Sequence, residues 1–305
     1  MQTWVTIYTP TYNRAYILHQ LYESLLSQTD QNFIWLIVDD GSTDNTQELV
    51  KQWLQEQKIN IDYQYKPNGG KHTAMEYAHQ ICRTPFIVCV DSDDALTDDA
   101  VELINKKVPD IVGRKNIAGV VGRRCDFTKK AFSEQWPSIQ QDVYFYDLYD
   151  VYGYNTDTIL IFKTDIVKQY HFPIFSDERF VSEKVLYKQF LYQYQMLAIV
   201  ELIYQCEYLQ DGYTNDKTLF DRNPKGNLAA LRQNAYLSIY DDKKSFDVKI
   251  REVAACYFWQ KRYHISDLDD VYKTKYPFAI IYYIIGKCLS YLFCIKHQIK
   301  TYTRH

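Results

Sequence analysis

An acidic run, Asp91-Ser92-Asp93-Asp94, directly follows an apolar stretch of the chain. Carboxylates this close together repel one another unless a cation shares their charge. Such oxygen ligands suit Mg²⁺ or Mn²⁺, and a site with one or two carboxylates completes its coordination with water and substrate phosphates. We therefore predict a divalent metal, Mn²⁺ or Mg²⁺, bound by Asp91 and Asp93, with Ser92 beside the same ligand. The alternative is a solvated acidic turn before a helix.

A second polar segment, Asn68-Gly69-Gly70-Lys71, combines two glycines with a cation. Glycine lets the backbone approach a ligand closely, and the ammonium group of Lys71 could meet a phosphate. The spacing is not that of a P-loop, and a plain connecting turn is the alternative. Arg14 is similarly either a phosphate contact or an exposed arginine in the first turn of a helix.

Short apolar runs that are typical of buried strands lie at residues 4–8, 33–38 and 86–90, and residues 59–65 supply a further strand. Helical spacing of apolar residues alternates with them over 16–26, after the capping residues 42–44, and over 74–81. Strands that alternate with helices predict a mostly parallel sheet, and its ligands bind outside the carboxyl ends of the strands. The polar loops should therefore converge on one cleft.

The rest of the chain is less regular. The pattern of residues 120–162 predicts strands rich in tyrosine, and that of residues 181–194 predicts a helix. We expect this middle region to bind the acceptor. Helical patterns predominate over 227–238, 247–263 and 278–297. We therefore predict a catalytic domain over 1–210 and a helical region over 211–305. The apolar segment 277–295 is either an interfacial helix that touches a membrane or an ordinary packed helix.

Composition narrows the class of protein. Hydrophobic residues make up 47% of the 305 residues and charged residues 24%, as in ordinary globular domains. The net charge of -3 argues against nucleic acid as a partner. The seven cysteines contain no CxxC pair, and no secretory signal precedes the first strand, so we expect a reducing cytoplasm. Helices of the C-terminal region could bring the chain to the inner face of the cytoplasmic membrane.

Taken together, four segments resemble the family 2 glycosyltransferases in order and spacing. They are Thr9-Pro10-Thr11-Tyr12-Asn13-Arg14, Val38-Asp39-Asp40-Gly41-Ser42-Thr43-Asp44, Asn68-Gly69-Gly70-Lys71 and Val90-Asp91-Ser92-Asp93-Asp94. The resemblance covers about the first third of the chain directly and extends weakly to about residue 194. It implies a GT-A-like, Rossmann-related α/β fold, a nucleoside-diphosphate sugar donor and inversion at the anomeric carbon.

The same resemblance assigns roles by position. Pro10 and Tyr12 would line the nucleotide pocket, and Asp39 or Asp40 would accept a hydrogen bond from the base, with Asp40 preferred. The alternative for residues 39–42 is a tight turn with a helix cap, and both readings can hold at once.

An inverting transferase also needs a carboxylate that removes the proton of the acceptor hydroxyl. The segment from Phe172 to Lys184 resembles the acceptor side of the family, and Glu183 is our predicted base. In the family this Glu is commonly followed directly by an Asp that is the catalytic base, whereas this chain has Lys at position 184. Asp177 and Glu178 therefore remain alternatives, and Glu183 could instead pair with a nearby Lys or Arg.

These features predict an inverting, metal-dependent transferase that moves a hexose or N-acetylhexosamine from a UDP-sugar to a saccharide or lipid-linked saccharide acceptor in surface-polysaccharide assembly. A nucleotidyltransferase is an alternative, but it would normally have a glycine-rich and basic loop after the first strand. A glycan-binding protein that kept the fold without turnover is the non-enzymatic alternative.

Overall fold

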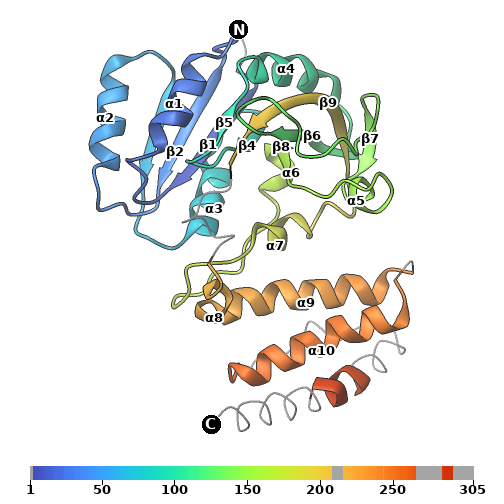
Figure 1. Ribbon diagram of the computed structural model, residues 1–305. Coiled ribbons are helices and arrows are strands. Elements are labelled where there is room, and N and C mark those ends of the chain that lie inside the picture. The colour runs from blue at the N-terminus through green and yellow to red at the C-terminus, as the bar shows by residue number, and fades with distance from the viewer. Residues whose placement is uncertain (1–2, 208–215, 243, 266–283, 291–305) are drawn as a thin grey trace. The chain divides into compact units, whose positions relative to one another are not determined.

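The four predicted strands are neighbours in one nine-stranded sheet of the computed structural model, which describes residues 3–207, 216–242, 244–265 and 284–290 (Figure 1). They are β1 (Val5–Thr11), β2 (Phe33–Asp39), β3 (Ile61–Tyr65) and β4 (Phe86–Cys89). All pairings among them are parallel, in the order β3-β2-β1-β4. The predicted parallel sheet is confirmed over this part.

Beyond β4 the sheet becomes mixed. β8 (Thr158–Lys163) runs antiparallel to both β4 and β6 (Ile117–Cys125), and β6 is parallel to β9 (Gln195–Gln205). β5 (Ala95–Leu96) and β7 (Gln141–Tyr144) each pair antiparallel with β9. The strand signals between residues 120 and 162 therefore correspond to β6, β7 and β8.

Helices cover both faces of the sheet, because successive side chains of a strand point to opposite sides. Val5 and Ile7 of β1 share a core cluster with residues of α1 (Leu18–Leu26), α2 (Thr46–Glu56) and α4 (Ala100–Lys107). Tyr8 of the same strand instead meets His79 of α3 (Lys71–Ile81). Strands buried on both faces read as continuous apolar runs, which explains why β1, β2 and β4 were visible in the sequence.

His79 gives this layer a pH dependence. Burial, with a smaller contribution from the positive charge of Lys168, lowers the pKa of His79 to about 3. An unfolded histidine titrates at about 6.5, so between these pH values only the unfolded chain binds the proton, and folding stability falls as the pH falls. We expect the free energy of unfolding to drop more steeply in the wild type than in His79→Gln, by up to about 1.4 kcal/mol per pH unit from pH 6 to pH 4. Urea denaturation at each pH measures this, and equal slopes would contradict it.

The predicted helix over residues 181–194 is too long. Only α7 (Glu183–Tyr187) is helical, and the chain then forms turns in which Phe190 O accepts hydrogen bonds from the N–H groups of Gln193 and Tyr194. β9 begins at the next residue. Apolar residues of these turns, such as Phe190 and Leu191, are buried at a spacing that imitates a helix. Three further short elements complete this part: α5 (Asp147–Asp150), α6 (Thr164–Val167) and the 3₁₀ helix Val108–Ile111.

The chain divides into two units. Residues 1–172 and 186–216 form unit 1, which contains the sheet, and residues 173–185 and 217–305 form unit 2. Unit 2 thus includes residues 173–185 from the middle of the chain. The prediction of a single boundary between residues 210 and 211 placed these residues in the catalytic domain.

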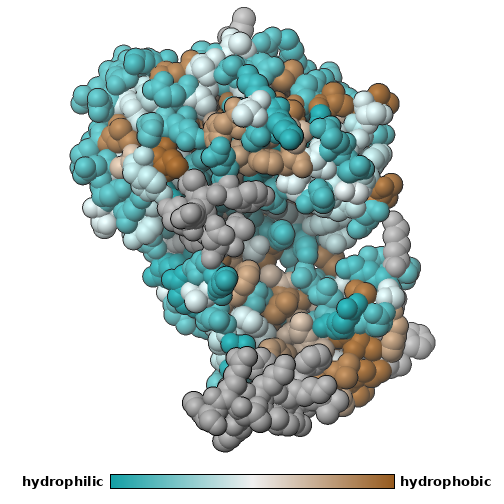
Figure 2. Space-filling model, viewed as in Figure 1, coloured by the Kyte–Doolittle hydropathy of each residue, from teal (hydrophilic) through white to brown (hydrophobic). Residues whose placement is uncertain are grey.

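Unit 2 is helical, with α8 (Leu219–Arg222), α9 (Pro224–Tyr240) and α10 (Phe246–Arg262). The helices predicted over 227–238 and 247–263 are confirmed by α9 and α10. Their shared core is small, with Leu228, Ala235 and Val253 among its buried residues, and Figure 2 shows hydrophobic, brown residues on the visible surface of this unit.

Most of the segment 277–295, which we predicted as an interfacial or packed helix, lies outside the described residues. Residues 284–290 are helical. Among the parts of the chain that the structure describes, no helix has both the length and the apolar composition needed to span a membrane.

Glu178 caps helix α9 from a distant part of the chain. It is only 4% exposed, and its two carboxylate oxygens accept hydrogen bonds of 2.8 Å from the backbone N–H groups of Lys225 and Gly226. These N–H groups lie in the first turn of the helix and have no partner within it. Gly226 permits the close approach, because a Cβ there would lie 2.1 Å from Phe180 O.

Removing this cap should destabilise the protein. We expect Glu178→Ala to lower the free energy of unfolding by about 2 kcal/mol, because two N–H groups lose their acceptor. Asp177→Ala is a matched control, since Asp177 pairs with the side chain of the same Lys225 but is 62% exposed. Exposed ion pairs contribute little, so this control should stay close to the wild type. Thermal unfolding of both variants measures the difference, and equal effects would exclude the cap.

Candidate active site

The carboxyl ends of β1, β2 and β4 meet at one edge of the sheet. Thr11 at the end of β1 pairs with Asp39 at the end of β2, and Tyr8 pairs with Cys89 at the end of β4. The loops that follow these strands therefore begin side by side. The predicted convergence of the polar loops is confirmed for the segments after residues 11, 39 and 89.

Asn13 ties the loop after β1 to the loop after β2. Its side-chain oxygen accepts hydrogen bonds from the N–H groups of Thr43 at 2.7 Å and Asp44 at 3.3 Å, and its own N–H donates to Ser42 Oγ at 2.9 Å. The positive φ of 53° at Asn13 makes this turn. Asp44 then accepts a hydrogen bond of 3.0 Å from the N–H group of Thr46, the first residue of α2, whose N-cap residue is Asn45, one position after the predicted capping residues 42–44.

The predicted nucleotide-contacting residues of this first loop lie at the same edge. Pro10 belongs to β1 and is buried, whereas the side chain of Tyr12 is 47% exposed. The guanidinium carbon of Arg14 lies 5.8 Å from the ring centre of Tyr16, and the two side chains are hydrogen bonded.

Asp39 and Asp40 are both buried and both hold loops in place. Asp39 accepts hydrogen bonds of 2.7 Å from Ser42 N and from Tyr63 Oη, and the pKa of Tyr63 is raised by burial first and by Asp39 second. The turn predicted for residues 39–42 is thus present. Whether either carboxylate also reads a base stays a prediction.

Asp40 shapes the glycine loop. Its carboxylate accepts hydrogen bonds from Lys66 Nζ at 2.5 Å, Gly69 N at 3.0 Å and Gly70 N at 2.7 Å. Gly70 has a φ of 93°, which a residue with a side chain rarely adopts, and α3 starts at the next residue. Asp40 therefore fixes the direction in which α3 and its first residue, Lys71, leave the loop.

Lys71 reaches the acidic run. Its ammonium nitrogen lies 2.7 Å from Asp91 Oδ1, and the two side chains are 23% and 30% exposed. Burial alone would raise the pKa of Asp91, but the charge and hydrogen bond of Lys71 outweigh burial and lower it. The structure thus brings together a predicted phosphate contact and a predicted metal ligand that lie twenty residues apart.

The pKa values of the other two carboxylates of the run, Asp93 and Asp94, are raised. Burial, followed by the negative charge of Asp91, raises the pKa of Asp93 even though Arg14 opposes the shift. The same two causes raise the pKa of Asp94 to about 7. A cation close to Asp91 and Asp93 would relieve this repulsion.

The donor set fits a hard divalent ion. Carboxylate oxygens are ligands that Mg²⁺ and Mn²⁺ accept, and Ser92 lies buried between the two acids. Within the described residues no group of three or more His, Cys, Asp or Glu side chains is arranged to hold a metal. A metal here would therefore need oxygen ligands from water and from a bound phosphate to complete its coordination.

Two residues of the site were not predicted. Tyr204 of β9 donates a hydrogen bond to Asp94 Oδ2 at 2.5 Å, and the guanidinium carbon of Arg124 on β6 lies 4.5 Å from the ring centre of Tyr204. Tyr204 lies 110 residues from Asp94 in the sequence. No local pattern could have revealed such a pairing.

The predicted base and its alternatives lie in unit 2. Glu183 is the first residue of α7. Both oxygens of Glu178 accept backbone hydrogen bonds, and both oxygens of Asp177 accept hydrogen bonds from Lys225 Nζ, at 2.8 and 2.7 Å. The assignment of Glu183 stays a prediction.

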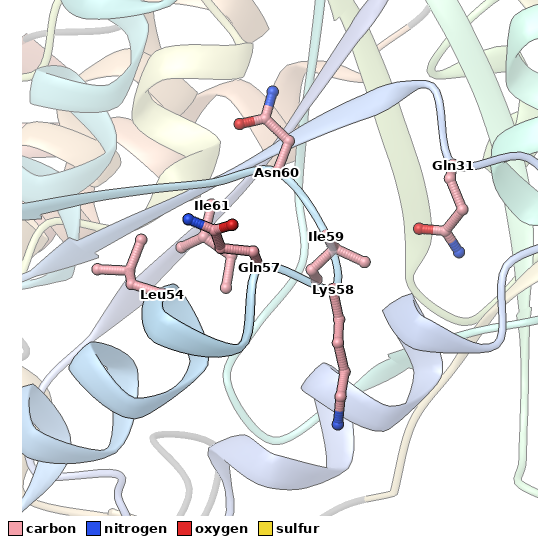
Figure 3. A pocket seen from close by; sticks show the side chains of 7 residues that line it. All are labelled: Gln31, Leu54, Gln57, Lys58, Ile59, Asn60 and Ile61. Carbon is pink, nitrogen blue, oxygen red and sulfur yellow. The ribbon is translucent and has the colours of Figure 1, made fainter.

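A surface hollow of about 430 Å³ lies at the other edge of the sheet (Figure 3). It is lined by Gln31, which precedes β2, by Asn60 and Ile61 at the start of β3, and by residues around the end of α2. Ligands of parallel sheets bind at the carboxyl ends of the strands. This hollow is therefore not part of the candidate site.

Comparisons with known proteins agree with the predicted family. The family model described as "Glycosyl transferase family 2" matches residues 6–170. Chondroitin synthase of Pasteurella multocida strain Pm70 is 39% identical over 103 residues, which are 34% of this chain and 11% of that protein. Glycosyltransferase GlyG of Streptococcus pneumoniae is 30% identical over 109 residues, which are 35% of this chain and 36% of that protein. This chain thus covers 36% or less of either relative.

Solved structures share the fold. TarS of S. aureus, residues 1–349 in complex with UDP-GlcNAc, has a TM-score of 0.59 and 15% identity over 85% of this chain and 81% of that chain. The mannosyltransferase PcManGT from Pyrobaculum calidifontis, in complex with GDP-Man and Mn²⁺, has a TM-score of 0.52 and 14% identity over 86% and 73% of the two chains. The predicted GT-A-like α/β fold is confirmed.

Proposed function

Because this chain belongs to glycosyl transferase family 2 and is therefore a glycosyltransferase, we propose that it transfers a hexose or N-acetylhexosamine from a UDP-sugar to a saccharide or lipid-linked saccharide acceptor. One observation carries the proposal. Asp40, Gly69, Gly70, Lys71 and Asp91 form an unbroken series of contacts along the edge where the strands end. Such a series suits a ligand with a base at one end and a diphosphate at the other.

The choice of UDP and of a saccharide acceptor draws on similar proteins. TarS was solved with UDP-GlcNAc, and relatives of this chain include a chondroitin synthase and a hyaluronan synthase. The names of these two relatives support polysaccharide synthesis. As its setting we propose surface-polysaccharide assembly in the cytoplasm or at the inner face of the cytoplasmic membrane.

We assign the diphosphate to Lys71 and the metal to Asp91 and Asp93. A bound Mn²⁺ or Mg²⁺ would stabilise the negative charge that develops on the leaving diphosphate. Arg14 and Lys71 add positive charge near the same carboxylates, since both oppose the rise in the pKa of Asp93 that burial and the charge of Asp91 cause. Lys71 can exchange its contact with Asp91 for a phosphate oxygen because its side chain is flexible and partly exposed.

The acceptor oxygen attacks the anomeric carbon from the face opposite the leaving diphosphate, and this direct attack inverts the configuration. A base must remove the proton of the acceptor hydroxyl on that side. We assign this role to Glu183. The assignment follows the position of Glu183 in the segment that resembles the acceptor side of the family.

Calorimetric titration of UDP and of GDP in the presence of Mn²⁺ tests the donor site. We expect UDP to bind with Mn²⁺, to bind much more weakly after EDTA removes the metal, and to lose at least about tenfold in affinity in Asp93→Ala. Asp98→Ala is the control, because Asp98 is 62% exposed and pairs with Lys129. If neither nucleotide binds to the wild type under any condition, the proposed donor is wrong.

A further inference from the structure

Tyr204 contacts the acidic run at two points with a single hydroxyl group. Its Oη donates a hydrogen bond to Asp94 Oδ2 at 2.5 Å and accepts one from Asp91 N at 3.3 Å. The Tyr204 side chain is 1% exposed, and the Asp94 side chain is 6% exposed. The buried carboxyl group of Asp94 and the partly buried N–H group of Asp91 both need partners, and here the same hydroxyl is the partner of both.

The ring of Tyr204 is itself held from the neighbouring strand. Arg124 of β6, which pairs with Tyr204 in the sheet, places its guanidinium group over the ring. Arg124 Nε donates a hydrogen bond to Thr158 O of β8 at 3.1 Å. The hydroxyl is therefore held by contacts between the neighbouring strands β6 and β9, and it meets the loop that follows β4.

The turn that Tyr204 contacts carries the proposed metal ligands. Within this turn Asp94 N donates a hydrogen bond to Asp91 O at 3.1 Å, so its two ends are linked through the backbone as well as through Tyr204. Asp93 lies between them. A change at either end of so short a turn must move the Asp93 carboxylate.

We propose that Tyr204 is a positioning residue, which acts through Asp94 and the N–H of Asp91 to hold Asp91 and Asp93 in the geometry that binds the metal and the donor diphosphate. This inference rests on the proposed function. Tyr204 does not touch the ligand. Partners behind the ligands of a metal typically change its affinity by about tenfold to a hundredfold.

The test compares two tyrosine-to-phenylalanine variants. Tyr204→Phe removes the hydroxyl and keeps the ring. Tyr22→Phe is the matched control, because Tyr22 is 3% exposed and its hydroxyl donates a hydrogen bond to the carboxylate of Glu56 at 3.0 Å, on helices α1 and α2. The readout is the Mn²⁺ concentration that gives half-maximal UDP binding in calorimetry, together with the melting temperature of each variant.

We expect Tyr204→Phe to raise this Mn²⁺ concentration at least about tenfold, and Tyr22→Phe to leave it unchanged, with similar losses of melting temperature in both. Because Tyr204 acts partly through Asp94, the double variant Tyr204→Phe/Asp94→Ala should raise the required Mn²⁺ concentration by less than the two single effects combined. A requirement in Tyr204→Phe within twofold of the wild type overturns the inference, and so does an additive double variant.

Two further outcomes are separable. If the wild type binds no UDP with Mn²⁺, the proposed function is wrong. If the wild type and Tyr204→Phe bind UDP at the same Mn²⁺ concentration, only the proposed role of Tyr204 is wrong. If Tyr204→Phe does not fold, Asp94→Ala carries the test, and an unchanged Mn²⁺ requirement in that variant overturns the inference.

Discussion

Replacing Glu183 by glutamine should lower the turnover number at least about a hundredfold and leave UDP binding unchanged, because glutamine cannot accept the proton of the acceptor hydroxyl. The two side chains have nearly the same shape, so packing around α7 should be preserved. Release of UDP from a UDP-sugar in the presence of a saccharide acceptor measures turnover, and calorimetry measures binding. The separation of the two readouts distinguishes a catalytic loss from a loss of the donor site.

Asp177→Asn is the companion variant. We expect it to keep its turnover, because the Asp177 carboxylate already pairs with Lys225. If Asp177→Asn loses turnover and Glu183→Gln keeps it, the base is Asp177. If both keep full turnover, the base is Glu178 or lies outside this segment. A wild type that binds UDP-sugar and acceptor without any turnover would favour the glycan-binding alternative.

The second large effect concerns Gly119 on β6. A Cβ at this position would lie 1.8 Å from Ile161 O and 2.9 Å from the carbonyl carbon of Ile161, on the neighbouring strand β8. Backbone atoms in the centre of a sheet cannot move aside as a flexible side chain can. We expect Gly119→Ala to lower the free energy of unfolding by at least about 3 kcal/mol, measured by urea denaturation.

Gly113→Ala is the matched control for this substitution. Gly113 lies in the turn before β6, and no atom lies within 4 Å of the position that its Cβ would take. The same chemical change should therefore alter stability by less than about 0.5 kcal/mol. A result in which the two variants unfold at the same urea concentration would mean that β6 and β8 can separate to admit a methyl group.

The part of the fold that could be predicted is the part in which sequence neighbours are also neighbours in space. β1, β2 and β4 are parallel strands that are almost entirely buried, and their apolar runs are continuous. β9 was missed, although ten of its residues from Met196 to Gln205 are mostly apolar, because the turns before it imitate a helix. β8 lies antiparallel beside β4, and their paired residues are more than seventy positions apart in the sequence. The periodicity of apolar residues within one segment gives no information about such a pairing.

The candidate site divides in the same way. Residue type at a strand end singled out Asp91 and Asp93, the glycine loop singled out Lys71, and the family resemblance singled out Asp39 and Asp40. Their connections were not predictable, since the contact of Lys71 with Asp91 depends on Gly70 and on the hydrogen bonds of Asp40. Glu178 shows the converse limit. A carboxylate in a promising segment proved to be a helix cap whose partners lie almost fifty residues away.

The discontinuity of unit 2 bears on how such a protein can change over evolutionary time. The chain passes between the units three times, so no single crossover point in the gene separates them. A recombination that replaced residues 217–305 with the tail of another transferase would leave residues 173–185 behind, and Glu178 would face a foreign helix start. Inheritance should therefore keep the two units together, and a change of acceptor preference should arise by point substitution more readily than by exchange of the tail.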